Sequence, residues 1–243
     1  MAMAKQIDYR SIVFFILFSS SLTASFVFAG DAATLRVIGF SADGKYLAFE
    51  QHGIEDGSGF PYAHIFFVDV ENNTFAAPSV AVREENEEAL ATTMRATVTQ
   101  RAQSVLRRLN IVEGNIGAHL IHHPLTDTGV DPHVVKFSLS PALAGSADQP
   151  YEIILSETEV KEDCYGFGNG RIFELALVNP QTGARKVLQK DERLPKARGC
   201  PLSYRLQDVF VYDERYVAVF LNVLKPGFEG HDMRFMVVTG VLE

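Results

Sequence analysis

Short runs in which hydrophobic and polar residues alternate recur along most of the chain, and an alternation with a period of two is typical of β-strands. The first runs lie at 34–40, 45–51 and 63–70, with a short run near Phe75. Between the first two runs stands Asp43-Gly44, which is a strong signal for a β-hairpin. We therefore predict a four-stranded antiparallel sheet over residues 34–77.

The same succession of strands and turns recurs twice further along the chain. A second set covers 134–188 and a third covers 206–241. Four strands in this order resemble one blade of a β-propeller, but three sheets are fewer than the four to eight blades of a closed ring. The prediction is a mainly β fold of three propeller-blade-like antiparallel sheets, and it leaves open whether they close into a ring.

One stretch between the first two sets has the period of an α-helix. Its hydrophobic positions are Leu90, Met94, Val98, Val105 and Leu109. Four glutamates at 84–88 and three arginines at 101–108 lie near its two ends, as the helix dipole favours. These features predict one long inserted helix over about 84–109. Because the helix has a single apolar stripe, we expect it to cover a sheet rather than to dock a partner.

The first 29 residues have the three parts of a secretory signal peptide. Lys5 and Arg10 precede the apolar run 12–18, and Val27 and Ala29 provide the small residues of a cleavage site. The apolar run is well short of the ~20 residues that span a bilayer, so a retained membrane anchor is the weaker interpretation. We predict cleavage near Ala29, a periplasmic or secreted location, and one secreted domain over 30–243.

The balance of charge narrows the range of partners. The chain has 22 basic and 30 acidic residues, a net charge of −8 at pH 7. Such an excess of negative charge disfavours binding to nucleic acid or to anionic lipid.

Cys164 and Cys200 are the only cysteines of the chain. An exported chain meets an oxidising compartment, which favours a disulfide between them over two free thiols. The chain-entropy model gives such a bond about 4 kcal/mol of stabilisation.

A dense group of possible metal ligands follows the predicted helix: His119, His122, His123, Asp127, Asp131 and His133. Imidazole and carboxylate groups at short spacing can bind zinc or another transition metal. The sequence has no H-E-x-x-H metalloprotease signature, and Pro124 favours a polar connector over a helix. We expect no cofactor, and the alternative is a zinc site on the four histidines His119, His122, His123 and His133.

Two loops combine glycines, acidic residues and aromatic rings. The residues expected to contact a ligand are Asp56, Phe60 and Tyr62 in the loop 52–62, and Tyr165 and Phe167 in the loop 162–170. Aromatic rings beside carboxylates can bind a sugar, a peptide or a cationic group. The glycine run of the second loop leads into a strand, whereas a phosphate cradle opens a helix, so we expect no phosphate there.

Three stretches carry a resemblance to a known family: 39–49 (GFSADGKYLAF), 56–62 (DGSGFPY) and 164–170 (CYGFGNG). Together with the order of signal, blade, helix and sheets, they resemble a bacterial family of predicted secreted proteins, the domain of unknown function 2259. The first stretch is also similar to the WD40-like repeats of propellers. The resemblance covers essentially the whole mature chain. It implies export, and it implies no catalytic residue because the family has no established activity.

The sequence contains no G-x-S-x-G nucleophile motif and no other recognisable catalytic set. We therefore predict a non-enzymatic exported binding or scaffold domain. Its partner would be a protein, peptide or glycan outside the cytoplasm, and no stable membrane span is expected after signal cleavage. The alternative is a metal-dependent hydrolase centred on the histidines of residues 119–133.

Overall fold

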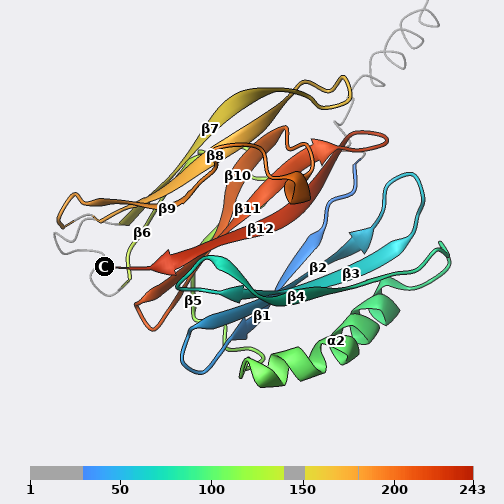
Figure 1. Cartoon of the computed structure of the whole chain (residues 1–243), viewed down its shortest axis with the longest axis horizontal. Coiled ribbons are helices and arrows are strands. Elements are labelled where there is room, and N and C mark those ends of the chain that lie inside the picture. The colour runs from blue at the N-terminus through green and yellow to red at the C-terminus, as the bar shows by residue number, and fades with distance from the viewer. Residues whose placement is uncertain (1–29, 140–150, 180, 243) are drawn as a thin grey trace, which may run out of the picture.

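The computed structural model describes residues 30–139, 151–179 and 181–242, so the predicted signal peptide lies outside the described residues. The described chain forms three four-stranded antiparallel sheets, one α-helix and one short 3-10 helix. The mainly β fold class with one helix is thus confirmed. The sheets stack as layers, with the helix as an outer fourth layer (Figure 1).

Each sheet corresponds to one of the predicted sets of strands. Sheet 1 contains β1 (Thr34–Phe40), β2 (Tyr46–Ile54), β3 (Pro61–Asp69) and β4 (Thr74–Arg83) in that order. Sheet 2 contains β6 (Val134–Phe137), β7 (Tyr151–Asp163), β8 (Asn169–Val178) and β9 (Arg185–Lys190) in that order. Sheet 3 has the order β12-β11-β10-β5, with β5 (Ala118–His122), β10 (Ser203–Tyr212), β11 (Tyr216–Pro226) and β12 (His231–Val241).

Sheet 3 is the middle layer, although its three long strands follow all the strands of sheets 1 and 2 in the chain (Figure 1). In β11 the residues that pack toward sheet 2 are Val217, Val219, Leu221 and Val223, and those that pack toward sheet 1 are Tyr216, Ala218 and Phe220. All seven are buried. A strand with neither face in water needs a nearly continuous hydrophobic sequence, which is what β11 has.

Strand β5 was not predicted, because its sequence was interpreted as a polar connector. It pairs with the edge of β10, where Ile121 lies opposite Val209 and His122 opposite Asp208. Its Ala-His-Leu-Ile-His sequence is short and polar, and edge strands of this kind resist pairing with other chains. The third set of strands therefore obtains its fourth member from a segment more than 80 residues earlier in the chain.

Helix α2 (Ala91–Arg108) covers the outer face of sheet 1. The buried residues Met94, Val98 and Ala102 pack in one cluster with Ile65 and Phe67 of β3. The predicted apolar stripe is therefore confirmed from Met94 onward, and the helix covers a sheet as expected.

The predicted start of the helix at residue 84 is wrong. Strand β4 continues to Arg83, whose guanidinium group bonds Glu55 and Glu85, and the Glu84 N–H donates to the Pro61 carbonyl. These contacts hold the glutamates in a strand end and a turn, so no acidic residue lies in the first helical turn. Leu90 precedes the helix and is exposed.

A buried carboxylate ties the helix to sheet 1. Glu50 of β2 is fully buried and accepts hydrogen bonds from Arg95 of α2 at 2.7 Å and from Arg36 of β1 at 3.2 Å. A charge without water around it requires such partners, because an unpaired buried carboxylate is strongly destabilising. The pair of arginines thus fixes the helix on the sheet while it satisfies Glu50.

Glu50→Gln is expected to lower the free energy of unfolding by about 2 kcal/mol, since it removes the charge from two charge-assisted hydrogen bonds. Urea denaturation followed by circular dichroism measures the change. Glu159→Gln, at a half-exposed position in sheet 2, is the control and should change stability by less than about 0.5 kcal/mol. Equal effects of the two substitutions would contradict a structural role for Glu50.

The predicted disulfide is confirmed: Cys164 and Cys200 are bonded, with Cα atoms 5.6 Å apart. Cys164 follows β7, and Cys200 follows the 3-10 helix η2 (Lys196–Arg198). The bond therefore joins the long connection between β9 and β10 to the end of sheet 2. None of the described helices is long and apolar enough to cross a membrane.

Candidate functional site

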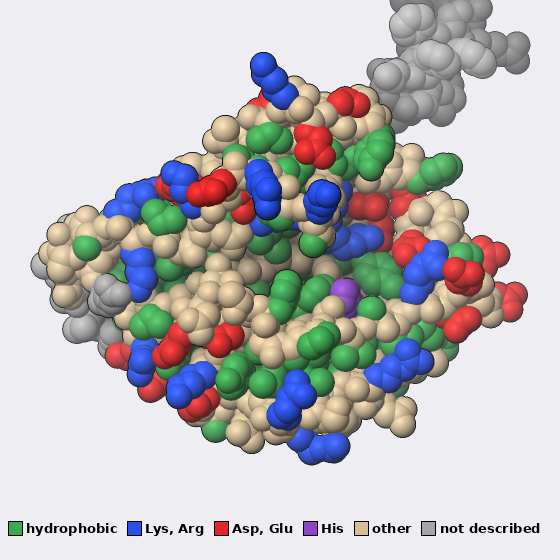
Figure 2. Space-filling model, viewed as in Figure 1, with side chains coloured by type: hydrophobic (Ala, Val, Ile, Leu, Met, Phe, Trp, Pro, Cys, Tyr) green, Lys and Arg blue, Asp and Glu red, His purple; other side chains and the backbone are tan. Residues whose placement is uncertain are grey.

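A groove of about 550 Å³ opens between sheet 1 and sheet 3 and is closed at one side by η2 and the end of β9. Its size lies in the usual range for small-molecule sites. Figure 2 shows the hollow in this face of the molecule, with hydrophobic side chains inside it and Lys and Arg side chains along its upper edge. The groove is therefore a candidate site for a small ligand.

The floor of the groove is aromatic. Alternation along β3 points Ala63, Ile65 and Phe67 to the helix, so His64 and Phe66 face the groove. Phe66 stacks on Phe49 of β2 with ring centroids 5.0 Å apart, and the His64 ring lies 3.9 Å from that of Phe66. Phe75 extends this row to the rim.

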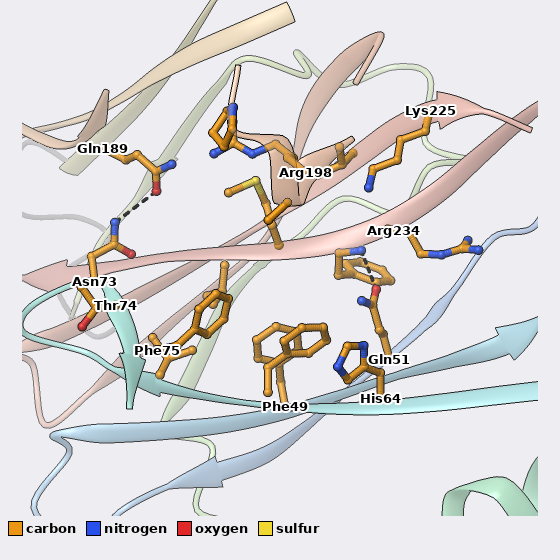
Figure 3. Close-up of a pocket in the computed structure, with 18 residues that line it drawn as sticks. Phe49, Gln51, His64, Asn73, Thr74, Phe75, Gln189, Arg198, Lys225 and Arg234 are labelled. Atoms are coloured by element: carbon orange, nitrogen blue, oxygen red, sulfur yellow. Dashed lines mark hydrogen bonds between the residues drawn. The ribbon is translucent and has the colours of Figure 1, made fainter. Parts of the chain in front are cut away.

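The opposite wall carries three cationic side chains, Arg198, Lys225 and Arg234. In Figure 3 Arg198 and Lys225 come from above the groove, whereas Phe49, Gln51 and His64 come from the strands below. Phe235, Met236 and Val237 of β12 add apolar surface between the two walls. The groove therefore has an apolar interior and a basic side.

The two arginines already have carboxylate partners. Arg198 bonds both oxygens of Asp191, donates to the Tyr204 hydroxyl at 3.1 Å, and lies over the Phe173 ring. Arg234 donates to the Asp31 carboxylate at 2.6 Å. These pairs fix the guanidinium groups in place and balance their charge.

Lys225 is different, because it forms no ion pair or hydrogen bond with any other described residue. It is half-buried, and burial, reinforced by the charges of Arg234 and Arg198, lowers the pKa of its ammonium group. The negative charge of Asp232, its cross-strand neighbour, raises the pKa of Lys225. The Asp232 carboxylate forms its ion pair with Arg234 instead, with Oδ2 3.9 Å from Nη2. The groove thus contains one ammonium group that forms no direct ion pair within the part of the chain that the structure describes.

A second polar atom in the groove has no partner. The Nε2 atom of His64 is buried and makes no hydrogen bond with the described residues. Burial lowers the pKa of this imidazole, so the neutral ring is favoured. Buried polar atoms normally have a partner, so an unpartnered one in a residue that lines a groove indicates a water molecule or a ligand atom nearby.

Three other polar residues of the groove form hydrogen bonds within the protein. The Gln51 Oε1 atom accepts from the Phe235 N–H at 2.9 Å, and the Asn73 amide donates to Gln189 at 3.1 Å (Figure 3). These bonds join β2 to β12 and the β3–β4 turn to β9. They hold the walls of the groove at a fixed separation.

The predicted loop 52–62 uses its polar and aromatic residues in contacts within the protein. Asp56 accepts from the Glu229 N–H at 2.8 Å, Phe60 lies under the Arg83 guanidinium group, and Tyr62 donates to Asp31. Arg234 lies over the Tyr62 ring, so this tyrosine borders the ion pair beside the groove. Their role in ligand contact stays a prediction.

The second predicted loop is more open. Tyr165 is 83% exposed and Phe167 is 48% exposed. Phe167 approaches His231 with ring centroids 6.3 Å apart, and the neighbouring Phe228 lies against Gly57. The tips of three hairpins, one from each sheet, therefore meet at one end of the layers (Figure 1). Binding by Tyr165 and Phe167 likewise stays a prediction.

The structure divides the predicted histidine cluster. His119 and His122 converge on Asp208 of β10, whereas His123 and His133 do not join them. His133 lies 3.7 Å from Glu157, and the His123 N–H group of the backbone donates to Gln207. Asp131 accepts from the His133 backbone, and Asp127 accepts from the Gly129 backbone. The four histidines thus do not form one centre.

The family model described as "Predicted secreted protein (DUF2259)" matches residues 48–240, from the second strand of sheet 1 to the last strand of sheet 3. The chain belongs to this family. The match includes sheets 2 and 3, α2, sheet 1 apart from β1 and the start of β2, and every residue of the groove, which agrees with the family resemblance inferred from the sequence. The similarity of the first stretch to WD40-like repeats is not confirmed. No curated protein matches the chain.

Sequence reasoning missed the residues that form the groove. Lys225 and Arg234 stand in runs with the pattern of strands, and Arg198 stands in a connection without an evident motif. One signal was available: β3 has the sequence His-Ile-Phe-Phe, in which His64 and Phe66 share a face. A histidine among the apolar residues on one face of a strand indicates that a polar group is needed at that place.

Proposed function

We propose that this family member is an exported, non-enzymatic binding protein that captures a small anion with an apolar body in the groove between sheets 1 and 3. The observation that carries the proposal is the Lys225 ammonium group, which forms no ion pair with the described residues and lines the groove opposite its aromatic floor. A carboxylate or sulfonate would pair with this ammonium group. Its hydrocarbon or aromatic part would pack on Phe49 and Phe66.

Two further features support this ligand class. His64 lines the groove, and its Nε2 atom makes no hydrogen bond with the described residues. Arg198 and Arg234 form ion pairs with aspartates of the protein. They therefore shape the wall of the groove and do not add a second unpaired positive charge to it. A ligand with one negative charge therefore matches the charge balance better than a polyanion.

The export part of the proposal rests on residues 1–29 as a cleavable signal peptide with cleavage near Ala29, and it places the mature protein in the periplasm or the medium. The family of predicted secreted proteins and the disulfide support this location. The alternative function, a metal-dependent hydrolase on four histidines, lacks support because His123 and His133 lie apart from the other two.

Binding of 8-anilinonaphthalene-1-sulfonate to the mature protein tests the groove. We expect its fluorescence to rise on binding and dodecanoate to displace it, whereas dodecyltrimethylammonium should not. Lys225→Met keeps an unbranched side chain of nearly the same length and removes the charge. It should weaken dodecanoate binding by about 10-fold or more, because a charge-assisted contact contributes about 1.5–3 kcal/mol.

Lys136→Met is the matched control, since Lys136 is an exposed lysine on sheet 2 outside the groove. It should leave the dissociation constant of dodecanoate within about 2-fold of the wild-type value. Displacement of the dye by the cationic detergent as readily as by dodecanoate would overturn the proposal. An unchanged affinity of the folded Lys225→Met variant would do the same.

A further inference from the structure

Two histidines of β5 point to the same side of sheet 3, although they are three positions apart. In a regular strand such residues lie on opposite faces. Here the pairing between β5 and β10 shifts between Val209 and Phe210, so His119 pairs with Phe210 and His122 with Asp208. This irregularity brings both imidazole rings to one carboxylate.

That carboxylate is buried and accepts from both rings. The Oδ1 atom of Asp208 lies 2.7 Å from His119 Nε2 and 2.6 Å from His122 Nδ1. The side chain of Asp208 is 4% exposed. One nitrogen from each histidine and one oxygen of Asp208 all lie within 4.8 Å of one another.

A second layer of hydrogen bonds orients the carboxylate. The Gln207 amide donates to Asp208 Oδ2 at 2.8 Å, and the Asn222 amide of β11 donates to Gln207 Oε1 at 2.7 Å. Gln207 and Asn222 are themselves buried. Metal-binding carboxylates are commonly held in this way, and the outer contacts preserve the geometry of the ligands.

The two histidine rings contact protein atoms on one side and are exposed to solvent on the other. His119 stacks on Phe210 with ring centroids 4.2 Å apart and an angle of 9° between the planes. Its side chain is 36% exposed, and that of His122 is 58% exposed. The three groups thus form a shallow site with a buried base and an open side that solvent can reach.

We propose that His119, His122 and Asp208 bind a divalent first-row transition metal ion, for which zinc is the natural probe. Two imidazoles and a carboxylate form a common ligand set for such ions. In a tetrahedral zinc site with bonds of about 2.0–2.2 Å, the ligand atoms lie about 3.3 Å apart. The two imidazole nitrogens would therefore move away from Asp208 Oδ1 by a fraction of an ångström when zinc binds. The open side leaves a coordination position for water or an exogenous ligand.

The other explanation for this cluster is a histidine pair that only balances a buried aspartate. The two explanations differ in the need for both histidines: one protonated imidazole suffices for charge balance, whereas the metal requires each ring as a ligand. The site shares no residue with the groove, so metal binding and anion binding can fail independently of each other.

Isothermal titration of the untagged, chelator-treated mature protein with zinc chloride tests the site. We expect about one equivalent of zinc to bind and to raise the melting temperature. His122→Ala should weaken zinc binding 10-fold or more, and His119→Ala/His122→Ala should abolish it. Cobalt(II) should give visible absorption bands in the wild-type protein that the double variant lacks.

Two controls make the result specific. His133→Ala removes an exposed histidine outside the site and should leave the zinc affinity unchanged. The circular dichroism spectrum of His122→Ala should equal that of the wild type, which shows that this variant is folded. Less than about 0.2 equivalents of bound zinc, or the same affinity in the double variant as in the wild type, would overturn the proposal.

Discussion

Phe220→Ala is expected to lower the free energy of unfolding by about 4 kcal/mol. Phe220 is fully buried on β11, at the interface of sheet 3 with sheet 1. Its ring meets Phe49 edge-on at 5.2 Å between centroids and Phe210 at 5.8 Å. The substitution removes both contacts and leaves a cavity at the centre of the stack, where neighbouring strands cannot collapse into it.

Guanidinium chloride denaturation of the variant and the wild type measures this loss. Phe228→Ala is the control, because Phe228 is 79% exposed at a hairpin tip and should change stability by less than about 0.5 kcal/mol. A loss below about 1 kcal/mol for Phe220→Ala would mean that sheets 1 and 3 do not pack as described. The groove borders this interface through Phe49, so the variant should also bind dodecanoate more weakly.

Removal of the disulfide by Cys164→Ala/Cys200→Ala is the second large expected effect, a loss of about 4 kcal/mol in the free energy of unfolding. The two cysteines are 36 positions apart, and the bond restricts the unfolded chain over that whole segment. The segment includes β8, β9 and η2, so the loss should also affect the groove wall formed by Pro195, Ala197 and Arg198.

We therefore expect the double variant to unfold at lower denaturant and to bind dodecanoate several-fold more weakly. Treatment with a reductant should shift the wild type toward the variant and leave the variant itself unchanged. That second comparison separates the bond from the substitution. Identical unfolding midpoints for the oxidised wild type and the variant would show that the bond does not stabilise the fold.

Much of the fold could be predicted from the sequence because local patterns specify it. The Asp43-Gly44 hairpin, the alternation in β3 and the helical spacing of Met94 and Val98 are all signals within a few residues. The start of α2 was wrong because Arg83 and Glu84 make contacts with the β2–β3 segment, and no local pattern reveals these. Strand β5 was missed because its pairing partner lies far along the chain.

The candidate sites depend on such distant contacts even more strongly. The groove combines β3, η2, β11 and β12, and the free charge of Lys225 is defined only by which carboxylates the two arginines occupy. The histidines of the metal site were visible in the sequence. Their partner Asp208 was not, because it joins them only through the irregular pairing of β5 with β10.

The position of sheet 3 between the other two has a consequence for the order in which the chain can fold. Its three long strands, residues 203–241, follow the strands of sheets 1 and 2 in the chain, yet among the described residues it is these strands that cover the inner faces of both sheets. Native contacts of such long sequence separation form slowly. The clusters that join sheet 3 to sheets 1 and 2 are therefore expected to form late in folding, whereas the cluster between sheet 1 and α2 can form before them.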